Sequence, residues 1–331
     1  MKLKKCAALL LVSSCLLTGC TTSSAKKVDS KYVVASLEKG NKTKNIFADN
    51  LYKDIIDNSS NNSTVFNAVL QNLVDQKFPV NDDMKEDAAT IIKQIKSAYK
   101  SNYGDNYKDS LNQALTSAGY KNLSEYRQRM IKQIQYANFL LDYIDDHFDD
   151  VFNDYYQQCA PKYVSLIKIS VSDTSSPTDD ETSKLNEVKE LISNTDKSFG
   201  DIAQDYSADS TSSKKGSLGI VDSKDTSGIA NSYGKDVFNA IEALSEGQVS
   251  DVITGDDGYY FVKVTSTDKK TLKKELKKTD IDSPLLAYDD YLQYVVYNSY
   301  KINYKDKDIK KIVQEVVNKA LEERKTERGE A

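Results

Sequence analysis

Two strand patterns about a hundred residues apart enclose a block of mixed structure, and both sides of this block are flanked by long helical patterns. Residues 163–171 alternate apolar and polar side chains as a half-buried strand does, and residues 258–264 are rich in aromatic and β-branched side chains. Between them a Ser/Gly/Lys loop is predicted over residues 207–219. The intervening periodicity predicts three helices, over residues 181–193, 199–206 and 237–244. This order predicts a small α+β domain.

The two flanks are predicted to be helical almost throughout. A weak strand is predicted over residues 32–37. The expected N-terminal helices cover residues 46–56, 65–78, 82–103, 107–118 and 125–148, and the expected C-terminal helices cover residues 281–300 and 309–324. The basic run 269–278 is interpreted as a solvated face. Because the C-terminal helices need an apolar partner, we expect them to pack on the N-terminal helices and form one mostly α domain around the α+β insert.

The first twenty residues have the pattern of a bacterial lipoprotein signal. A positive start over residues 1–5 precedes an apolar stretch over residues 6–17, which is too short to remain as a membrane-spanning helix. The motif Leu17-Thr18-Gly19-Cys20 then resembles a lipobox. The resemblance implies cleavage before Cys20 and attachment of a diacylglycerol to its sulfur. The alternative is an ordinary secretory signal with a Cys by chance.

Cysteine use and charge limit the chemistry of the exported chain. Only Cys159 would remain as a thiol after cleavage and lipidation, so no internal disulfide is expected. Cys159 is not expected to be a nucleophile, because the single histidine, His147, lies in an acidic helical run. The acidic run 145–150 lacks a calcium-loop glycine, so no metal site is predicted. Removal of Lys2, Lys4 and Lys5 takes the formal net charge from −5 to −8. We therefore expect no nucleic-acid partner, and an anionic membrane should repel the chain.

These patterns divide the chain into five parts. The predicted parts are a signal peptide (1–19), the lipidated Cys20 with a spacer (20–30), an N-terminal helical part (31–158), the α+β domain (159–267) and C-terminal helices that pack on the N-terminal part (268–331).

Four ordered motifs in the predicted α+β domain resemble those of parvulin-type peptidyl-prolyl isomerases. They lie at residues 199–209, 215–219, 243–250 and 258–264, and they begin with the helix and turn from Phe199 to Asp209. Together with the lipobox and the helical flanks, they make the chain similar to PrsA-type foldase lipoproteins of Gram-positive bacteria and to lactococcal proteinase-maturation lipoproteins. The resemblance implies a parvulin-like domain inserted between helical segments.

The sequence departs from the parvulin pattern at the two positions where the family has histidines. Leu166 stands at the position in the first strand and Tyr260 at the position in the last, while Asp209 keeps the acidic position. Leucine has no hydrogen-bonding group, whereas the Tyr260 hydroxyl can replace part of a histidine's role. Prolyl isomerisation breaks no bond, and an enzyme need only favour the twisted amide against a barrier of about 18–20 kcal/mol.

The resemblance implies a membrane-anchored, extracytoplasmic foldase that assists newly translocated secreted proteins without a cofactor or a metal. Its isomerase domain is expected to have weak or no isomerase activity, because both catalytic histidine positions are replaced. One alternative is an active peptidyl-prolyl isomerase that uses Asp209 and Tyr260. Another is a solute-binding lipoprotein, although such a protein would need more strands than this chain offers. Whether the helical flanks form a homodimer is left open.

Overall fold

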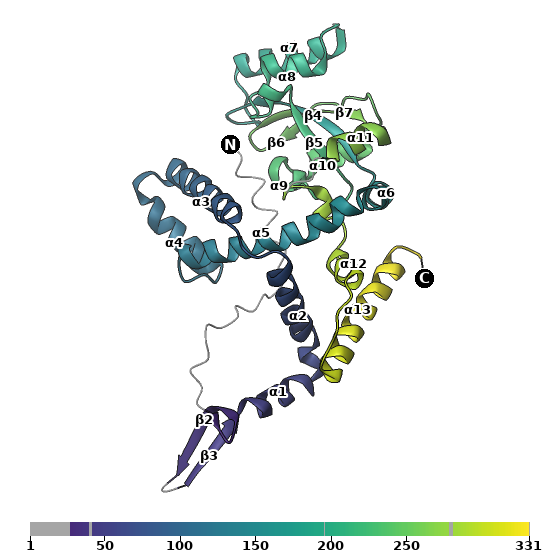
Figure 1. Cartoon of the computed structure of the whole chain (residues 1–331). Coiled ribbons are helices and arrows are strands. Elements are labelled where there is room, and N and C mark those ends of the chain that lie inside the picture. The colour runs from purple at the N-terminus through teal and green to yellow at the C-terminus, as the bar shows by residue number, and fades with distance from the viewer. Residues whose placement is uncertain (1–26, 40–41, 195, 278–280, 331) are drawn as a thin grey trace. The chain divides into compact units, whose positions relative to one another are not determined.

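The computed structural model describes residues 27–39, 42–194, 196–277 and 281–330 (Figure 1). The predicted signal peptide, Cys20 and the spacer as far as residue 26 lie outside the described residues. Within the described part of the chain, no helix is both long and apolar enough to cross a bilayer. The α+β class is confirmed, since a small antiparallel sheet domain lies among helical segments.

Two compact units make up the described chain. Asp82–Asp290 form the first, and the described residues up to Asn81 form the second together with those from Tyr291 onward. The first unit contains the sheet domain and the helices directly before it. The helices before the sheet domain are therefore divided between the two units.

The sheet domain is built on four antiparallel strands in the order β5-β4-β7-β6. The strands are β4 (Lys162–Ser170), β5 (Ser217–Val221), β6 (Ile253–Gly255) and β7 (Gly258–Ser266). The two predicted strands, β4 and β7, are the central pair, with Ile167 opposite Phe261. Strand β5 begins inside the predicted loop 207–219, so this part of the loop prediction is wrong. Its short Ser-Leu-Gly-Ile-Val run does not alternate clearly enough to signal a strand.

Helices cover both faces of this sheet, as Figure 1 shows. The helices are α7 (Asp179–Asn194), α8 (Phe199–Tyr206), α9 (Ile229–Tyr233) and α10 (Lys235–Ala243). Helices α7 and α8 pack on the face that carries Ile167 and Ile169, and α9 and α10 pack on the face that carries Val164 and Leu166. Each fully buried aliphatic side chain stabilises the fold by about 1.5–3 kcal/mol relative to an exposed one.

Local hydrogen bonds fix where α7 and α8 begin. Glu181 accepts the Thr178 N–H at 2.8 Å, and Thr178 Oγ1 accepts the Glu181 N–H at 3.2 Å, which makes a reciprocal capping box. The side chain of Ser198 accepts the Asp201 N–H at 3.1 Å and so caps α8.

Four helices precede the sheet domain in the first unit. They are α3 (Asp82–Tyr103), α4 (Tyr107–Ser117), α5 (Leu123–Asp146) and α6 (Phe148–Cys159). Helix α6 was not predicted, and the run 145–150 spans the exposed end of α5 and the start of α6. In the described part of the chain no group of three or more His, Cys, Asp or Glu side chains is placed to hold a metal ion.

Helix α6 attaches the helical segment to the sheet domain. The hydroxyl of the buried Tyr155 donates to the buried carboxylate of Asp222 at 2.8 Å, and burial, followed by the charge of Asp222, raises the pKa of Tyr155. Cys159 is also buried, and its carbonyl oxygen accepts the Ser223 N–H at 2.9 Å. The helix ends at Ala160, which has a left-handed φ of 43°.

The segment after the sheet domain differs from the sequence-based expectation in two places. Residues expected to be a solvated basic face form α11 (Lys269–Leu276), in which Leu272 and Leu276 are buried. The helix expected over residues 281–300 is instead a 3-10 turn, η5 (Pro284–Leu286), and a separate helix, α12 (Leu292–Ser299). Ser283 caps this 3-10 turn and Pro284 begins it, so residues 281–300 do not form one continuous helix.

The second unit combines a small sheet with four helices. Its elements are β1 (Lys27–Val28), β2 (Lys31–Lys39), β3 (Lys42–Phe47), α1 (Ala48–Ile56), η2 (Ser59–Asn61), α2 (Asn62–Lys77), α12 and α13 (Lys307–Glu327). Helix α13 packs on α2, in line with the expected packing of C-terminal on N-terminal helices. Phe66 of α2 is fully buried against the rings of Tyr294 and Tyr297, at centroid distances of 5.0 and 5.1 Å.

Candidate functional site

Leu166 and Tyr260, which stand where the parvulin family has histidines, lie on the same face of the sheet. Leu166 pairs with Val262 in the β4–β7 ladder, and Tyr260 is two residues before Val262, so the side chains of Leu166 and Tyr260 point to one side. Both belong to one buried cluster. Leu166 is fully buried and offers no hydrogen-bonding atom. The face is therefore apolar where the family pattern has its first histidine.

Tyr260 is held by charged groups at the turn before β7. Its hydroxyl donates a hydrogen bond to Asp257, and burial, followed by this hydrogen bond, raises the pKa of Tyr260. Lys168 forms an ion pair with Asp257 and lies 5.7 Å from the centroid of the Tyr260 ring. The tyrosine is consequently neutral at physiological pH, and its oxygen retains acceptor capacity.

Asp209 lies in the loop that follows α8. One carboxylate oxygen accepts the N–H and the hydroxyl of Thr211, at 2.8 and 2.7 Å. The other accepts the hydroxyl of Tyr233 at 3.3 Å. Burial, followed by the charge of Asp209, raises the pKa of Tyr233. Tyr233 therefore belongs to the site, although no recognised motif surrounds it.

Tyr233 connects the two predicted site residues. Its ring meets the Tyr260 ring edge-on, with a centroid distance of 6.2 Å and an interplanar angle of 80°. Asp209 and Tyr260 share no hydrogen bond in the described network, and Tyr233 lies between them. Two carboxylates thus bracket a pair of tyrosines, Asp209 at one end and Asp257 at the other.

The loop that carries Asp209 is hydrogen-bonded to the backbone of β4 at Lys168. Ser207 Oγ accepts the N–H groups of Lys168 and Asp209, at 3.0 and 3.2 Å, and the Ala208 N–H donates to the Lys168 carbonyl at 2.8 Å. Because these bonds use the backbone of β4, the position of Asp209 is coupled to the strand that carries Leu166.

Gly216 allows the same loop to return against β4. Its carbonyl accepts the Leu166 N–H at 2.8 Å, and its φ is +75°. A Cβ atom at this position would lie 2.4 Å from the Leu166 carbonyl oxygen. Only glycine fits this backbone without displacement.

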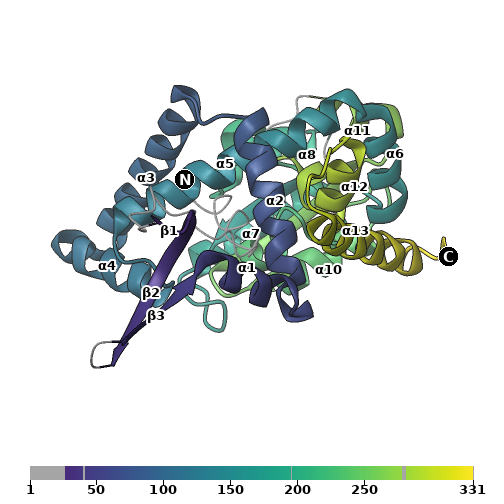
Figure 2. The ribbon, with the colours of Figure 1, turned by 60° about the horizontal axis from the view of Figure 1, so that its bottom comes forward.

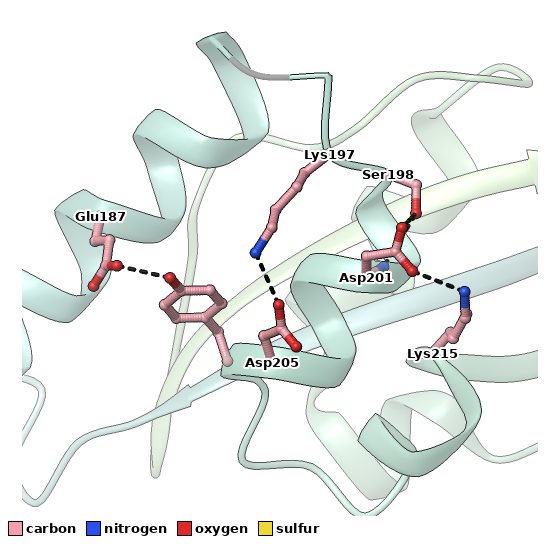
Figure 3. A network of polar contacts seen from close by, with 7 residues as sticks. Glu187, Lys197, Ser198, Asp201, Asp205 and Lys215 are labelled. Carbon is pink, nitrogen blue, oxygen red and sulfur yellow. Dashed lines mark hydrogen bonds and ion pairs between the residues drawn. The ribbon is translucent and has the colours of Figure 1, made fainter.

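A polar network on the surface of α8 fixes the other end of the loop (Figure 3). Lys215 donates to Asp201 at 2.7 Å, and Ser198 donates to the second oxygen of the same carboxylate at 2.7 Å. Lys215, followed by Ser198, lowers the pKa of Asp201. A neighbouring pair joins Lys197 to Asp205 at 2.8 Å. The network ties the residue before Gly216 to α8.

The chemistry available at this site is hydrogen bonding and apolar contact. Asp209, Tyr233 and Tyr260 contain no thiol or imidazole, so they supply no strong nucleophile near neutral pH. Six partly buried apolar residues pack against the cluster beneath, namely Leu218, Tyr233, Phe238, Ala240, Leu244 and Ile253. Such a surface suits an apolar ring beside an amide, which is the chemistry of a proline-containing peptide.

Comparison with known families agrees with this geometry. A model of the rotamase family, described as the PPIC-type PPIase domain, matches residues 166–266. The match begins at Leu166 and ends with β7, so it includes Asp209, Tyr233 and Tyr260. Residues 166–266 are thus similar to a PPIC-type PPIase domain.

Curated relatives extend the similarity to foldases. The foldase protein PrsA of Staphylococcus aureus and that of Staphylococcus epidermidis are each 32% identical to this chain over 141 residues, which cover 40% of this chain and 41% of the relative. The chain thus matches about two fifths of the length of these relatives. These findings confirm the resemblance to PrsA-type parvulin-like foldases.

Solved structures of foldases align over most of the chain. The alignment with PrsA from Bacillus subtilis covers 86% of this chain and 98% of the other, with 21% identity and a TM-score of 0.40. The alignment with foldase protein PrsA from Streptococcus pneumoniae covers 85% and 99%, with 19% identity and a TM-score of 0.38.

Proposed function

We propose that this chain is a lipid-anchored extracytoplasmic foldase that holds unfolded, newly translocated proteins while they fold. Its second unit binds apolar segments of the client, and its PPIC-type domain binds proline-containing segments. The PPIC-type match and the similarity to foldase proteins support this assignment. Holding a client requires no reactive group, and none of the three predicted site residues provides one.

The observation that carries the proposal is an open apolar groove in the second unit. The groove has a volume of about 440 Å³ and is lined by residues of α1 and α2 together with Ile302 and Ile309. Nine of its lining residues are aliphatic or aromatic, and the other two are the amides Asn72 and Gln76. A groove without charge favours apolar side chains of many sequences, because the driving force is the removal of apolar surface from water.

One wall of this groove is held by a hydrogen bond at the start of α13. The Tyr52 hydroxyl donates to Asp306 at 2.6 Å, and this bond is the main cause that raises the pKa of Tyr52 to about 12. Asp306 also caps α13 by accepting the Asp308 and Ile309 N–H groups. The groove is thus preformed, while Ile55 on its wall remains 46% exposed and available to a client.

The test of this proposal is suppression of aggregation by the soluble mature chain, residues 21–331. A heat-unfolded model enzyme should scatter less light when the chain is present at an equimolar or twofold concentration. An inert protein of similar size and charge is the control. Failure to protect several unrelated unfolded proteins would contradict the foldase assignment.

A second function, prolyl isomerisation, is favoured by the bracketed tyrosine pair. In this reading Asp209 and Tyr260 are the catalytic residues, Tyr233 links them, and the apolar Leu166 forms the floor beneath the twisted amide. A protease-coupled assay on a proline peptide tests it with Asp209→Asn and Tyr260→Phe in the mature chain. Tyr206→Phe is the matched control, because Tyr206 also donates to a carboxylate, that of Glu187, away from the site. Background rates for the unmodified chain would exclude this function.

The anchoring part of the proposal rests on the lipobox ending at Cys20. Mass spectrometry of the N-terminal peptide from membrane-extracted protein should show a diacylglycerol on Cys20. The Cys20→Ser variant should appear in the soluble exported fraction. An unmodified Cys20 in the mature protein would contradict lipid anchoring.

A further inference from the structure

The first three strands form a small sheet that is exposed to an unusual degree. Strand β1 pairs with β2 and β2 with β3, all antiparallel, and Figure 2 shows β2 and β3 side by side. Val28, Tyr32, Val34 and Ile46 are 39%, 46%, 44% and 44% exposed. They are half of the most exposed large hydrophobic side chains in the described part of the chain. A small sheet that leaves these apolar side chains exposed is marginal in water, so a partner surface is expected.

The sheet is basic in a chain that is acidic as a whole. Residues 27–47 contain five lysines and two acidic residues, a net charge of three positive, whereas the whole chain carries −5. The overall repulsion from an anionic surface expected from the sequence does not hold for this sheet. It presents the opposite charge.

The strand register gathers lysines and apolar side chains on one side. Cross-strand partners point to the same side of a sheet, which places Lys27 with Tyr32 and Ala35 with Ile46. The register shift between Val33 and Ala35 brings these two pairs onto a common side, which also carries Lys44, two residues before Ile46. We call the side formed by Lys27, Tyr32, Ala35, Lys44 and Ile46 the basic side.

Lysine and ring are in contact on this side. The Lys27 ammonium lies 4.6 Å from the centroid of the Tyr32 ring. An apolar body with a polar or charged end is the kind of side chain that favours the boundary between lipid tails and headgroups. The basic side combines three such residues, Lys27, Tyr32 and Lys44, with the aliphatic Ile46.

The opposite side of the sheet carries an ion pair with the neighbouring helix α1. Val33 pairs with Phe47 on that side, and Lys31 lies 5.9 Å from the Phe47 ring and 3.7 Å from Asp49 of α1. The charge of Lys31 therefore has an acidic neighbour within the unit. On the basic side the lysines Lys27 and Lys44 are exposed.

From this combination we propose that the basic side of the β1–β3 sheet docks on the surface of an anionic phospholipid membrane. Lysine ammonium groups meet the lipid phosphates, while Tyr32 and Ile46 enter the headgroup boundary. A symmetric contact between two copies of this side would set lysines against lysines, which disfavours a second copy. A client chain is expected in the uncharged groove described above.

The place of the sheet in the chain fits such a contact. Lys27 follows Cys20 by seven residues, which span at most about 25 Å when fully extended. This step rests on the proposed lipid anchor, which would hold the sheet within reach of the membrane. The diacylglycerol would supply the attachment itself, and a basic patch beside it would add an electrostatic contact with the membrane surface. The docking would also orient the second unit at the membrane.

The experiment is co-sedimentation of the non-lipidated mature chain, residues 21–331, with vesicles of two compositions. Binding is expected to vesicles with 30% phosphatidylglycerol in phosphatidylcholine, to weaken as sodium chloride rises from 50 to 500 mM, and to be absent with phosphatidylcholine alone. Equal binding to both compositions, or none to the anionic vesicles at low salt, would overturn the proposal.

Variants then locate the contact. The double variant Lys27→Gln/Lys44→Gln should lower the partition coefficient roughly tenfold or more, and Tyr32→Ser/Ile46→Ser should also lower it severalfold. Lys311→Gln/Lys319→Gln is the matched control, since it removes two exposed lysines from α13. An equal loss in the control, or no loss in the sheet variants, would assign the binding to another surface and refute the proposal.

Two further measurements separate this proposal from its competitors. Sedimentation equilibrium should give the same mass for the unmodified chain and for Tyr32→Ser/Ile46→Ser, whereas a dimer abolished by these substitutions would show that the sheet binds a second copy. The same variants should keep their protection of an unfolded client. Loss of vesicle binding with protection retained would support the docking surface, and loss of protection in these variants would assign the sheet to the client instead. Circular dichroism confirms that each variant is folded.

Discussion

The hydroxyl of Tyr233 donates a hydrogen bond to Oδ2 of Asp209 at 3.3 Å, joining α9 to a loop that lies 24 residues earlier. The bond gives Asp209, which stands at the acidic position of the parvulin pattern, a tyrosine partner, and the ring of that tyrosine contacts the ring of Tyr260. The two sequence-predicted site residues are therefore connected by a third residue that no motif announced.

A double-mutant cycle should detect this connection. Asp209→Ala and Tyr233→Phe are each expected to destabilise the sheet domain, and the double variant should cost less than their sum. The coupling should be about 0.5–3 kcal/mol, the range for contacting residues in one hydrogen-bond network. Urea unfolding monitored by far-ultraviolet circular dichroism measures the free energy of unfolding of each variant. Additive single effects would show that the bond contributes nothing.

The charge of Asp257 should be visible in the titration of Tyr260. Because the Asp257 hydrogen bond and charge both raise the pKa of Tyr260, Asp257→Asn should allow the tyrosine to ionise at lower pH, although burial keeps its pKa above the ordinary value. Carbon-13 labelling of tyrosine rings and NMR titration measure the change, and Tyr260→Phe assigns the signal. Asp256→Asn, one residue away, is the control. An identical titration in both asparagine variants would contradict the assigned role of Asp257.

Two glycines with similar backbone angles offer a matched test of the loop. Gly216 and Gly219 have φ values of +75° and +82°, but a Cβ would clash with the Leu166 carbonyl oxygen only at Gly216. Gly219→Ala should cost about 1 kcal/mol through backbone strain, and Gly216→Ala should cost about 1–3 kcal/mol more. Thermal unfolding measures both. Equal losses would mean that the close approach to β4 is not maintained.

Glu181 should contribute to stability in a defined pH range. Backbone hydrogen bonds from Thr178 and then Ser172 lower the pKa of Glu181 to about 2. A carboxyl whose pKa is lower in the folded state stabilises the fold above its unfolded pKa, near 4.5, and this contribution is lost as pH falls toward 2. Glu181→Gln should therefore reduce stability at pH 7 and have little effect at pH 2. Urea midpoints measured at several pH values test this, with Glu190→Gln on the same helix as control. A deficit in Glu181→Gln that is independent of pH would contradict the linkage.

The central strands and the parvulin-like motifs could be predicted because their signals are local. Alternation marks β4, and aromatic and β-branched residues mark β7. Helix α6 was missed because acidic residues hide an apolar stripe formed by Val151, Phe152, Tyr155 and Cys159, which is recognisable only when its buried partner is known. Tyr233 was missed for a related reason, since its hydrogen bond depends on how a distant loop folds back.

In the C-terminal flank, local patterns predicted the wrong structure in two places. The apolar positions around residues 281–300 have helical spacing, but Ser283 and Pro284 start a 3-10 turn there. The lysines of α11 led to the prediction of a solvated face, although Leu272 and Leu276, four residues apart, form a buried face. The helical spacing of these two leucines within the basic run is the signal that indicates a buried helix face.

The central claim is that the groove of the second unit binds unfolded client chains. It is tested most directly by the affinity of the mature chain for a fluorescently labelled, permanently unfolded protein, measured by anisotropy. Ile55→Ser removes an exposed groove residue, and Tyr103→Ser removes an apolar side chain of comparable exposure, 53%, from α3. The account predicts about tenfold weaker binding for Ile55→Ser, because the client would otherwise bury that side chain, and unchanged binding for Tyr103→Ser. Equal affinities for the unmodified chain and Ile55→Ser would contradict the claim.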